Sequence, residues 1–261
     1  MSTSNELDAG LNDAARFVAL SNYVVALVGA GISVESGIPP FRGPGGIWTK
    51  IGEPAMSGYQ RFMDDPKGWW EERLSNRDDL AEFMKTLDEA KPNAAHQAMA
   101  EMERLGFLQH IITQNIDNLH QEAGSTAITE IHGNRFKLRC VECNARYPLE
   151  GFPLEEVPPL CPTCRGVLKT DTVMFGEPIP VDALRSCYNH TELCDCMLLV
   201  GTSAVVYPAA EFPLIALRAG AMLIEVNPEE TPLSPYCQVV LRAPAGEALP
   251  DLTQRLRSTR T

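Results

Sequence analysis

The sequence predicts an α/β fold built on a Rossmann-like, doubly wound parallel sheet. Short apolar runs alternate with segments of helical periodicity, which is typical of successive β–α–β units. Glycine or polar clusters directly follow five of these runs. One stretch, residues 135–172, departs from the alternation and indicates an inserted module, and 261 residues suffice for one large domain with an insertion.

The first predicted element is a helix that ends near residue 22, because Leu7, Leu11 and Val18 recur at helical spacing. Residues 23–28 form an uncharged and largely β-branched run, which indicates a strand buried on both faces. The long, aperiodic stretch from 39 to 66 is rich in glycine and proline and predicts a functional loop.

Apolar residues after this loop predict two short helices that pack as a satellite core: Trp69, Trp70, Leu74, Leu80, Phe83, Met84 and Leu87. Asn93 is expected to cap the next helix, which ends at Gly106. The later strands are expected at 107–113, 128–131, 197–200, 221–226 and 238–241, and the later helices at 181–193, at 208–219 and around Leu249, Leu252 and Leu256.

The glycine turn after the first strand is a candidate ligand site. Gly29 and Gly31 allow a tight turn and let a ligand approach bare backbone. A helical turn restarting at Ser33 would direct free N–H groups at a phosphate, and Arg42 offers a planar guanidinium for it. Val34 occupies the third glycine position of the dinucleotide fingerprint. The residues favour a variant nucleotide-phosphate site and leave open a corner without a ligand.

Polar clusters are expected at the same edge of the sheet, because ligands of doubly wound sheets bind beyond the carboxyl ends of the strands. These clusters are Gly29–Gly31, Gln114–Asp117, His132, Gly201–Ser203 and Asn227–Glu229. Their convergence predicts one large site.

His132 is the candidate general base, because it follows a strand and precedes a glycine, so its ring should be exposed at this edge. Asn115 and Asp117 stand two positions apart and can face one pocket, where they would recognise a carboxamide. Asp117 could also stabilise a developing cation. A helix cap before Leu119 is the alternative role, and Asn118 could provide the cap while Asp117 points elsewhere.

Two C-x-x-C pairs, Cys140 with Cys143 and Cys161 with Cys164, are separated by 17 residues. This spacing is typical of a structural zinc site with four thiolate ligands and no open coordination position. Redox disulfides are the alternative. A nucleic-acid-binding ribbon is poorly supported, since positions 135–169 hold six basic and four acidic residues. The other four cysteines, Cys187, Cys194, Cys196 and Cys237, are expected to be buried apolar residues.

The net charge of −12, from 22 Lys+Arg and 34 Asp+Glu, opposes non-specific binding to nucleic acid or anionic membranes and suits a cationic partner such as a lysine-rich peptide. No apolar run approaches the ~20 residues of a membrane span. The polar N-terminus is unlike a signal peptide. We therefore expect a cytoplasmic protein, in which cysteines more often bind metal than form disulfides.

Taken together and in this order, the motifs resemble the sirtuin family of NAD-dependent protein deacylases, over nearly the whole chain. They are Gly29-Ala30-Gly31-Ile32-Ser33, Gly37-Ile38-Pro39, Phe41-Arg42, Gln114-Asn115-Ile116-Asp117, His132-Gly133-Asn134, the two C-x-x-C pairs, Phe175-Gly176-Glu177, Gly201-Thr202-Ser203 and Val226-Asn227.

The resemblance implies a Rossmann-type domain with a small domain made of a zinc ribbon and a helical insertion. NAD would be bound at residues 1–39, 91–134 and 173–261; residues 40–90 would be the cofactor loop and helical insertion, and 135–172 the zinc ribbon. The implied NAD-binding residues are Gly29, Ala30, Gly31, Ile32, Ser33, Phe41, Arg42, Trp48, Gln114, Asn115, Ile116, Asp117, Gly201, Thr202, Ser203, Asn227, Glu229 and Ala245. Val173, Phe175 and Gly176 would pair with the substrate backbone as an added strand.

The implied reaction consumes NAD. The acyl-lysine carbonyl oxygen attacks the nicotinamide ribose as nicotinamide leaves, and His132 then acts as base on a ribose hydroxyl. The products are free lysine, nicotinamide and O-acyl-ADP-ribose. A mono-ADP-ribosyltransferase or NAD hydrolase is the alternative, which has less need of His132. A non-catalytic NAD-binding zinc-ribbon interaction protein is the alternative of another class.

Acyl preference is read from the helical insertion. Sirtuins that prefer acidic acyl groups carry a Tyr-x-x-Arg pair, and Arg73 and Asn76 stand at those positions in this sequence. The resemblance therefore implies deacetylation as the default activity.

Overall fold

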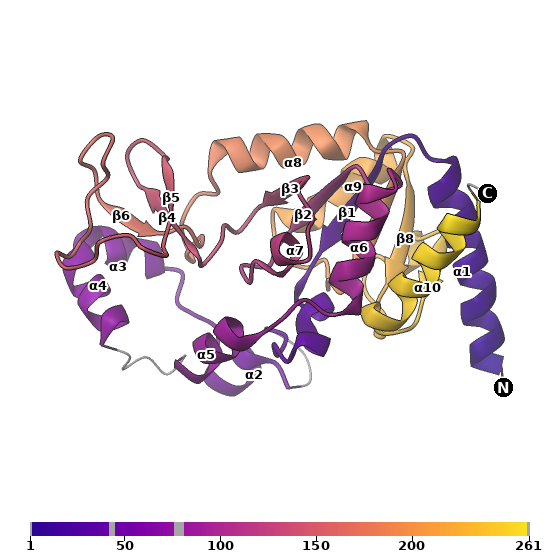
Figure 1. Ribbon diagram of the computed structural model, residues 1–261, viewed down its shortest axis with the longest axis horizontal. Helices are drawn as coiled ribbons and strands as arrows, with labels where there is room; N and C mark the ends of the chain where they lie inside the picture. The colour runs from indigo at the N-terminus through magenta and orange to yellow at the C-terminus, as the bar shows by residue number, and fades with distance from the viewer. Residues whose placement is uncertain (1, 42–44, 76–80, 260–261) are drawn as a thin grey trace.

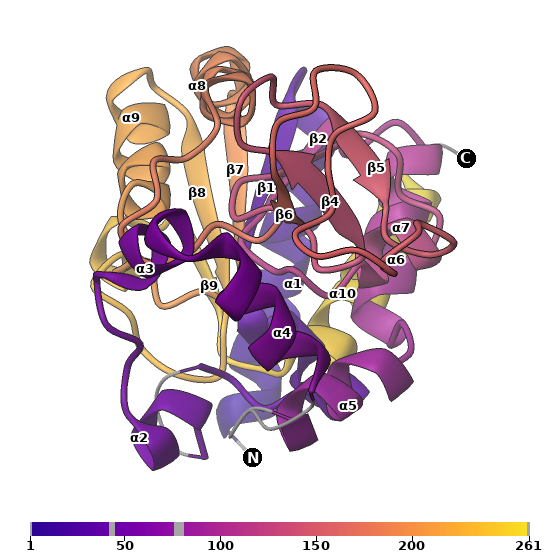
Figure 2. The same cartoon turned by 90° about the vertical axis from the view of Figure 1, so that its left-hand side faces the viewer.

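A computed structural model describes residues 2–41, 45–75 and 81–259 (Figures 1 and 2). Its centre is a six-stranded sheet of order β3-β2-β1-β7-β8-β9 in which all strand pairs are parallel. The strands are β1 (Val24–Val28), β2 (His110–Thr113), β3 (Ile128–Glu130), β7 (Cys196–Val200), β8 (Met222–Val226) and β9 (Val239–Leu241). The strand order reverses between β1 and β7, which marks the switch point of a doubly wound sheet and confirms the expected fold class.

The register of the central strands brings three loops together. Val28, the last residue of β1, lies opposite Thr113 of β2 and Val200 of β7. All three strands therefore end at the same level. The segments that begin at Gly29, Gln114 and Gly201 consequently meet above one edge of the sheet.

Helices cover both faces of the sheet (Figure 1). Side chains of β1 alternate between the two layers, with Val24, Ala26 and Val28 in one core cluster and Val25 and Leu27 in the other. The first layer holds α1 (Ser2–Leu20), α6 (Ala94–Arg104) and α10 (Ala245–Ser258), and the second holds α8 (Val181–Leu193), η2 (Ala209–Glu211) and α9 (Phe212–Arg218).

A smaller unit lies at the other end of the molecule (Figure 1, left). Its three-stranded antiparallel sheet has the order β5-β4-β6. Two helices of the 40–90 segment pack on it, and the indole Nε1 of Trp70 donates to the Leu168 carbonyl at 2.9 Å. The elements are β4 (Lys137–Cys140), β5 (Arg146–Pro148), β6 (Leu168–Thr170), α3 (Gly58–Asp64) and α4 (Pro66–Leu74).

The rest of the helical insertion packs elsewhere. Phe83 and Leu87 of α5 (Ala81–Glu89) join a cluster with Ile38 and Leu119, which belong to the large domain. The expected satellite core of residues 69–87 is therefore wrong as a single unit. Its tryptophans pack on the three-stranded sheet and its later residues pack beside the large domain, while Leu80 lies outside the described residues.

Several local expectations are also corrected. The stretch 39–66 contains α2 (Ile47–Ile51) and α3, because tertiary packing stabilises helices too short to show a clear period; Phe62 of α3 is fully buried. The turn expected to restart at Ser33 is the 3₁₀ helix η1 (Ala30–Ser36). Further short elements are α7 (Leu119–Glu122) and η3 (Ser234–Tyr236), and β2 begins at His110 rather than at 107. In the described ranges no helix has both the length and the apolar character needed to span a membrane.

Candidate functional site

The glycine turns after β1 and β7 touch at the switch point. The N–H of Gly31 donates to the Gly201 carbonyl at 2.8 Å. A Cβ atom at Gly31 would lie only 2.7 Å from the Cα of Gly201, so no other residue fits without moving the backbone. Gly201 itself has a φ of 55°. This close approach leaves a strip of bare backbone that a ligand can reach.

A cavity of about 1510 Å³ opens above these turns. Most of the residues predicted to bind NAD line it: Gly29, Ala30, Gly31, Phe41, Trp48, Gln114, Asn115, Ile116, Gly201, Thr202, Ser203, Asn227, Glu229 and Ala245. The candidate base His132 and the expected substrate segment Val173, Phe175 and Gly176 also line it. Arg42 lies outside the described residues.

Three predicted residues do not line the cavity. Ile32 and Ser33 are fully buried, and Asp117 is 4% exposed. The Ser33 hydroxyl donates to Asp117 Oδ2 at 2.7 Å instead of facing a ligand. Ile32 and Ser33 lie behind the cavity wall because the 3₁₀ helix starts three residues earlier than expected and buries both side chains, and Asp117 lies behind it with Ser33.

Ser33 and Asp117 together fix the orientation of the Asn115 amide. Because the Ser33 proton is committed to Asp117, the Ser33 oxygen can accept a hydrogen bond from Asn115 Nδ2, at 3.2 Å. The same Nδ2 lies 3.3 Å from the Gly29 carbonyl. With both bonds made by the nitrogen, Oδ1 of Asn115 is left as an acceptor. Asn115 can therefore receive a hydrogen bond from an amide N–H in the cavity.

Asp117, rather than Asn118, caps the helix that follows. Its Oδ1 accepts from the Leu119 N–H at 3.1 Å, whereas Asn118 makes no side-chain cap and accepts from Asn134 Nδ2 at 2.9 Å. The expected division, with Asn118 capping and Asp117 pointing elsewhere, is wrong. Asn118 has a φ of 67°, which turns its side chain away from the helix end. Burial raises the pKa of Asp117, and the Ser33 hydroxyl partly offsets this.

His132 lines the cavity at the expected edge of the sheet, but it is half-buried rather than exposed. Its Nδ1 lies 3.1 Å from the Gln114 carbonyl, which can only accept, so Nδ1 carries the proton and Nε2 has the lone pair. Burial lowers the pKa of His132, while the bond to Gln114 raises it. The ring is therefore neutral and able to accept a proton at pH 7.

Residues after β7 and β8 shape another part of the cavity wall. Gln114 Nε2 donates to the Thr202 hydroxyl at 2.9 Å, and Asn227 Nδ2 donates to the Thr202 carbonyl at 3.1 Å. The Asn227 Oδ1 in turn accepts from the Glu229 N–H at 3.2 Å. These bonds join three strand ends and leave the Glu229 carboxylate exposed at the rim.

Sequence reasoning missed several residues of the wall, among them Met56, Arg61, Val206 and Tyr207. Met56 and Arg61 come from the stretch expected to be a loop, and Val206 and Tyr207 directly precede a segment expected to form a helix. None of them belongs to a local motif with a known chemical role. Only the fold brings them to the cavity.

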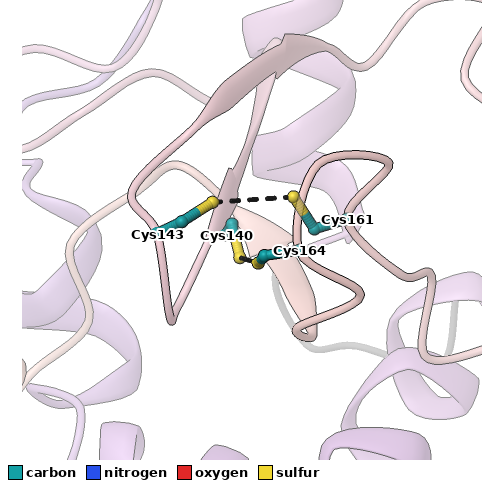
Figure 3. A group of neighbouring side chains, drawn as sticks. All are labelled: Cys140, Cys143, Cys161 and Cys164. Carbon is teal, nitrogen blue, oxygen red and sulfur yellow. Dashed lines mark hydrogen bonds between the residues drawn. The ribbon is translucent and has the colours of Figure 1, made fainter.

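The four motif cysteines converge in the small unit (Figure 3). Their sulfur atoms all lie within 4.8 Å of one another, with Cys140 and Cys164 at 3.5 Å and Cys143 and Cys161 at 3.7 Å. A tetrahedral zinc with Zn–S bonds near 2.3 Å places sulfur atoms about 3.8 Å apart. The donor set therefore fits a structural zinc ion. Cys187, Cys194 and Cys196 are buried as expected, and Cys237 is half-buried.

Comparisons with known proteins agree with this geometry. The sequence pattern of the Sir2 family matches residues 29–208. "NAD-dependent protein deacylase 2" of Pyrobaculum aerophilum is 42% identical over 246 residues, covering 93% of this chain and 94% of that protein. "NAD-dependent protein deacetylase" of Caldivirga maquilingensis is 43% identical over 244 residues, covering 92% and 91%.

Solved structures are similar over the same extent. A crystal structure of a Sir2 homologue in complex with NAD has a TM-score of 0.79 and 40% identity, covering 95% of this chain and 94% of that chain. A complex of Sir2 with a p53 peptide and NAD⁺ has a TM-score of 0.73 and 34% identity, covering 94% and 96%. The similarity thus includes both the large sheet and the small unit.

Proposed function

This chain belongs to the Sir2 family, the sirtuins, and we propose that its cavity at the sheet edge binds NAD and an acyl-lysine peptide side by side. The protein is an NAD-dependent protein deacylase. The observation that carries the assignment of residues is the position of His132, whose unprotonated Nε2 stands on the same wall as Asn115 and the glycine corner.

In this proposal the glycine corner Gly29–Gly31 and the backbone at Gly201 hold the pyrophosphate, because only bare backbone approaches there. Asn115 presents its Oδ1 to the nicotinamide carboxamide, and Ser33 and Asp117 act by holding that amide. Gln114 belongs to the nicotinamide pocket with Asn115, and Ser203, Asn227, Glu229 and Ala245 bind the adenosine half. Phe41 and Trp48 form the loop side of the cavity, and the motif assigns Arg42 to the phosphates.

His132 acts as the general base on a ribose hydroxyl after nicotinamide has left. Burial supports this role, since it keeps the imidazole neutral at pH 7. Val173, Phe175 and Gly176 lie beside His132 because the Val173 N–H donates to the His132 carbonyl at 2.9 Å. We assign the substrate backbone to this segment.

We keep the three units that the sequence predicts. Residues 1–39, 91–134 and 173–261 form the NAD-binding domain. Residues 40–90 form the cofactor loop and helical insertion, and residues 135–172 form the zinc ribbon. We also assign the protein to the cytoplasm, because a four-thiolate zinc site needs cysteines that stay reduced.

The test is incubation with NAD and an acetyl-lysine peptide, followed by mass spectrometry of nicotinamide, free lysine and O-acetyl-ADP-ribose. We expect all three products in equal amounts. His132→Ala should abolish deacetylation while NAD still binds, and His190→Ala is the matched control. His190 is also half-buried, but it lies beside Tyr23 at the opposite edge of the sheet.

Nicotinamide release that does not require the peptide would instead indicate an ADP-ribosyltransferase or NAD hydrolase. Absence of turnover with any acyl chain would indicate a binding protein. A succinyl-lysine peptide belongs in the same series, because Arg61 is a basic residue that lines the cavity, although Arg73 stands in place of the tyrosine of acid-preferring sirtuins. Undiminished turnover by His132→Ala would contradict its assignment as the base.

A further inference from the structure

A network of buried charges joins the zinc-binding unit to the segment 171–177, of which residues 172–177 line the cavity together with His132. Arg139 of β4 and Lys169 of β6 meet Asp171 and Glu177 of this segment. Their side chains are between 0% and 8% exposed. None of these four residues has a role in the proposed binding of NAD, and none of them is a zinc ligand.

Lys169 holds the start of the segment. Its ammonium group donates to the carbonyls of Thr170 and Thr172 at 2.8 and 2.7 Å and lies 3.1 Å from Glu177 Oε2. The side chain is fully buried, and burial lowers its pKa to about 8 despite the neighbouring Glu177. All three ammonium protons therefore have a partner, and two of the three partners are backbone carbonyls at the start of the segment.

Glu177 holds the middle of the segment. Its Oε2 accepts from the Met174 N–H at 2.8 Å, and its own N–H donates to the Met174 carbonyl at 2.9 Å. Its Oε1 accepts from the Arg139 guanidinium. Arg139 Nε also donates to Asp171 Oδ1 at 2.7 Å, so one arginine contacts both ends of the segment 171–177.

These bonds determine which backbone groups remain available. Both polar groups of Met174 are taken by Glu177. The Phe175 carbonyl accepts from the Tyr59 N–H at 3.0 Å. Within the described part of the chain, the Val173 carbonyl and the Phe175 N–H have no hydrogen-bond partner. A peptide that adds as a strand forms hydrogen bonds to such a pair, a carbonyl acceptor and an N–H donor two residues further along the chain.

Stability alone does not account for the network. A buried ion pair often stabilises a protein no more than apolar residues of the same size would, because both charges lose their hydration. Such groups are retained where they fix one conformation. In this protein the conformation that they fix belongs to the cavity wall.

We propose that Glu177, held by Lys169 and Arg139, is a positioning residue that presents the Val173 carbonyl and the Phe175 N–H to the substrate backbone. The inference rests on the proposed function, since it assumes that the acyl-lysine peptide lies along this segment. It adds a role for the zinc unit: Arg139 precedes the zinc ligand Cys140, so the metal site and the peptide-binding wall share one rigid strand.

The test is Glu177→Gln in steady-state deacetylation. An amide has one acceptor oxygen, so the substituted side chain cannot serve the Met174 N–H and the two cations together. We expect the KM for the acetyl-lysine peptide to rise about tenfold, as loss of a charge-assisted hydrogen bond predicts. The KM for NAD should change less than twofold, because the glycine corner does not contact the network.

Lys169→Met is the second variant and should raise the peptide KM in the same way, because it frees the Thr170 and Thr172 carbonyls. The double variant should raise the KM by less than the product of the two single effects, since both act on one unit. Glu101→Gln is the matched control: Glu101 also pairs with two arginines, Arg104 and Arg257, but on α6, and its peptide KM should not change.

Zinc content and thermal unfolding are measured for every variant. An unchanged peptide KM in Glu177→Gln, or equal rises in the KM for peptide and for NAD, would overturn the inference and leave the network with a general structural role. Wild-type protein that releases no lysine would overturn the proposed function itself, and the inference with it. The two failures are therefore distinguishable.

Discussion

The six-stranded sheet and the zinc-binding unit are stabilised in different ways. Every residue of β1 and β7 is buried, and apolar clusters cover both faces of the sheet. Among the described residues, the apolar core cluster of the zinc-binding unit has six buried members, of which Cys140 and Cys161 belong to the four-cysteine site and Phe62 and Trp70 come from the helical insertion. Apolar burial stabilises the sheet, whereas the small unit is stabilised by its metal site and by side chains that the helical insertion contributes.

Their buried polar groups differ as well. Where the small unit meets the segment 171–177, the buried charges of Arg139, Lys169 and Glu177 all have partners. In the large domain, His96 Nε2 and both ring nitrogens of His120 are buried without a partner among the described residues. The buried charges beside the cavity wall are thus paired, whereas the large domain holds buried imidazole nitrogens that have no partner among the described residues.

The largest expected effect is loss of zinc. Cys161→Ala removes a ligand that structural zinc sites need, and such sites contribute on the order of 10 kcal/mol to folding. We expect less than one zinc per chain by elemental analysis, rapid proteolysis within residues 135–172, and loss of peptide turnover. Far-UV circular dichroism should retain the helices of the large domain.

Cys237→Ala is the control, because Cys237 is half-buried and remote from the metal. If Cys161→Ala kept full zinc content and protease resistance, the small unit would not depend on its metal, and the contrast between the two regions would fail.

A smaller effect is expected from Gly31→Ala at the edge of the large sheet. The new Cβ would lie 2.7 Å from both the Cα and the carbonyl oxygen of Gly201, and backbone cannot yield as a side chain can. Overpacking of this kind costs about 3 kcal/mol. Urea unfolding should show this loss, calorimetry should show weaker NAD binding, and zinc content should stay unchanged.

Gly10→Ala is the matched control. Its Cβ would come closest to a methyl group of the Leu241 side chain, at 2.9 Å, which can move aside. Equal NAD affinity in Gly31→Ala and wild type would show that the backbone contact at the switch point does not shape the site.

The smallest expected effect is the contribution of His120 to the loss of stability at acid pH. Burial lowers its pKa to about 3, and the neighbouring His96, whose ring centroid is 4.9 Å away, adds to this. As the pH falls below 6.5 the unfolded chain binds the proton first, so the free energy of unfolding declines from pH 6.5 toward pH 3. At pH 5 the decline from this group is about 2 kcal/mol.

His120→Phe keeps an aromatic ring and removes the titrating group, so it should lose about 2 kcal/mol less than wild type between pH 7 and pH 5. Urea titrations at both pH values measure the difference. Identical pH dependence in the two proteins would mean that His120 is hydrated rather than buried without a partner.

Local sequence patterns predicted much of the fold and part of the candidate site. The β-branched run before Gly29 predicted β1, and helical spacing predicted α8 at its observed bounds, 181–193. The C-x-x-C spacing predicted the thiolate cluster, because each pair turns tightly within four residues. The order of the motifs along the chain indicated the family, since order is itself a property of sequence.

What the sequence alone determined is therefore what short segments encode: strand and helix identity, the metal-binding turns, and the residue types at strand ends. Only the tertiary structure decided that Ser33 and Asp117 lie behind the wall and orient Asn115, that α4 and α5 pack on different cores, and that Lys169 and Glu177 meet at the segment 171–177. These outcomes depend on contacts between residues far apart in the chain, and the direction of a side chain at such a contact is determined by burial and by the hydrogen-bond partners that the fold provides.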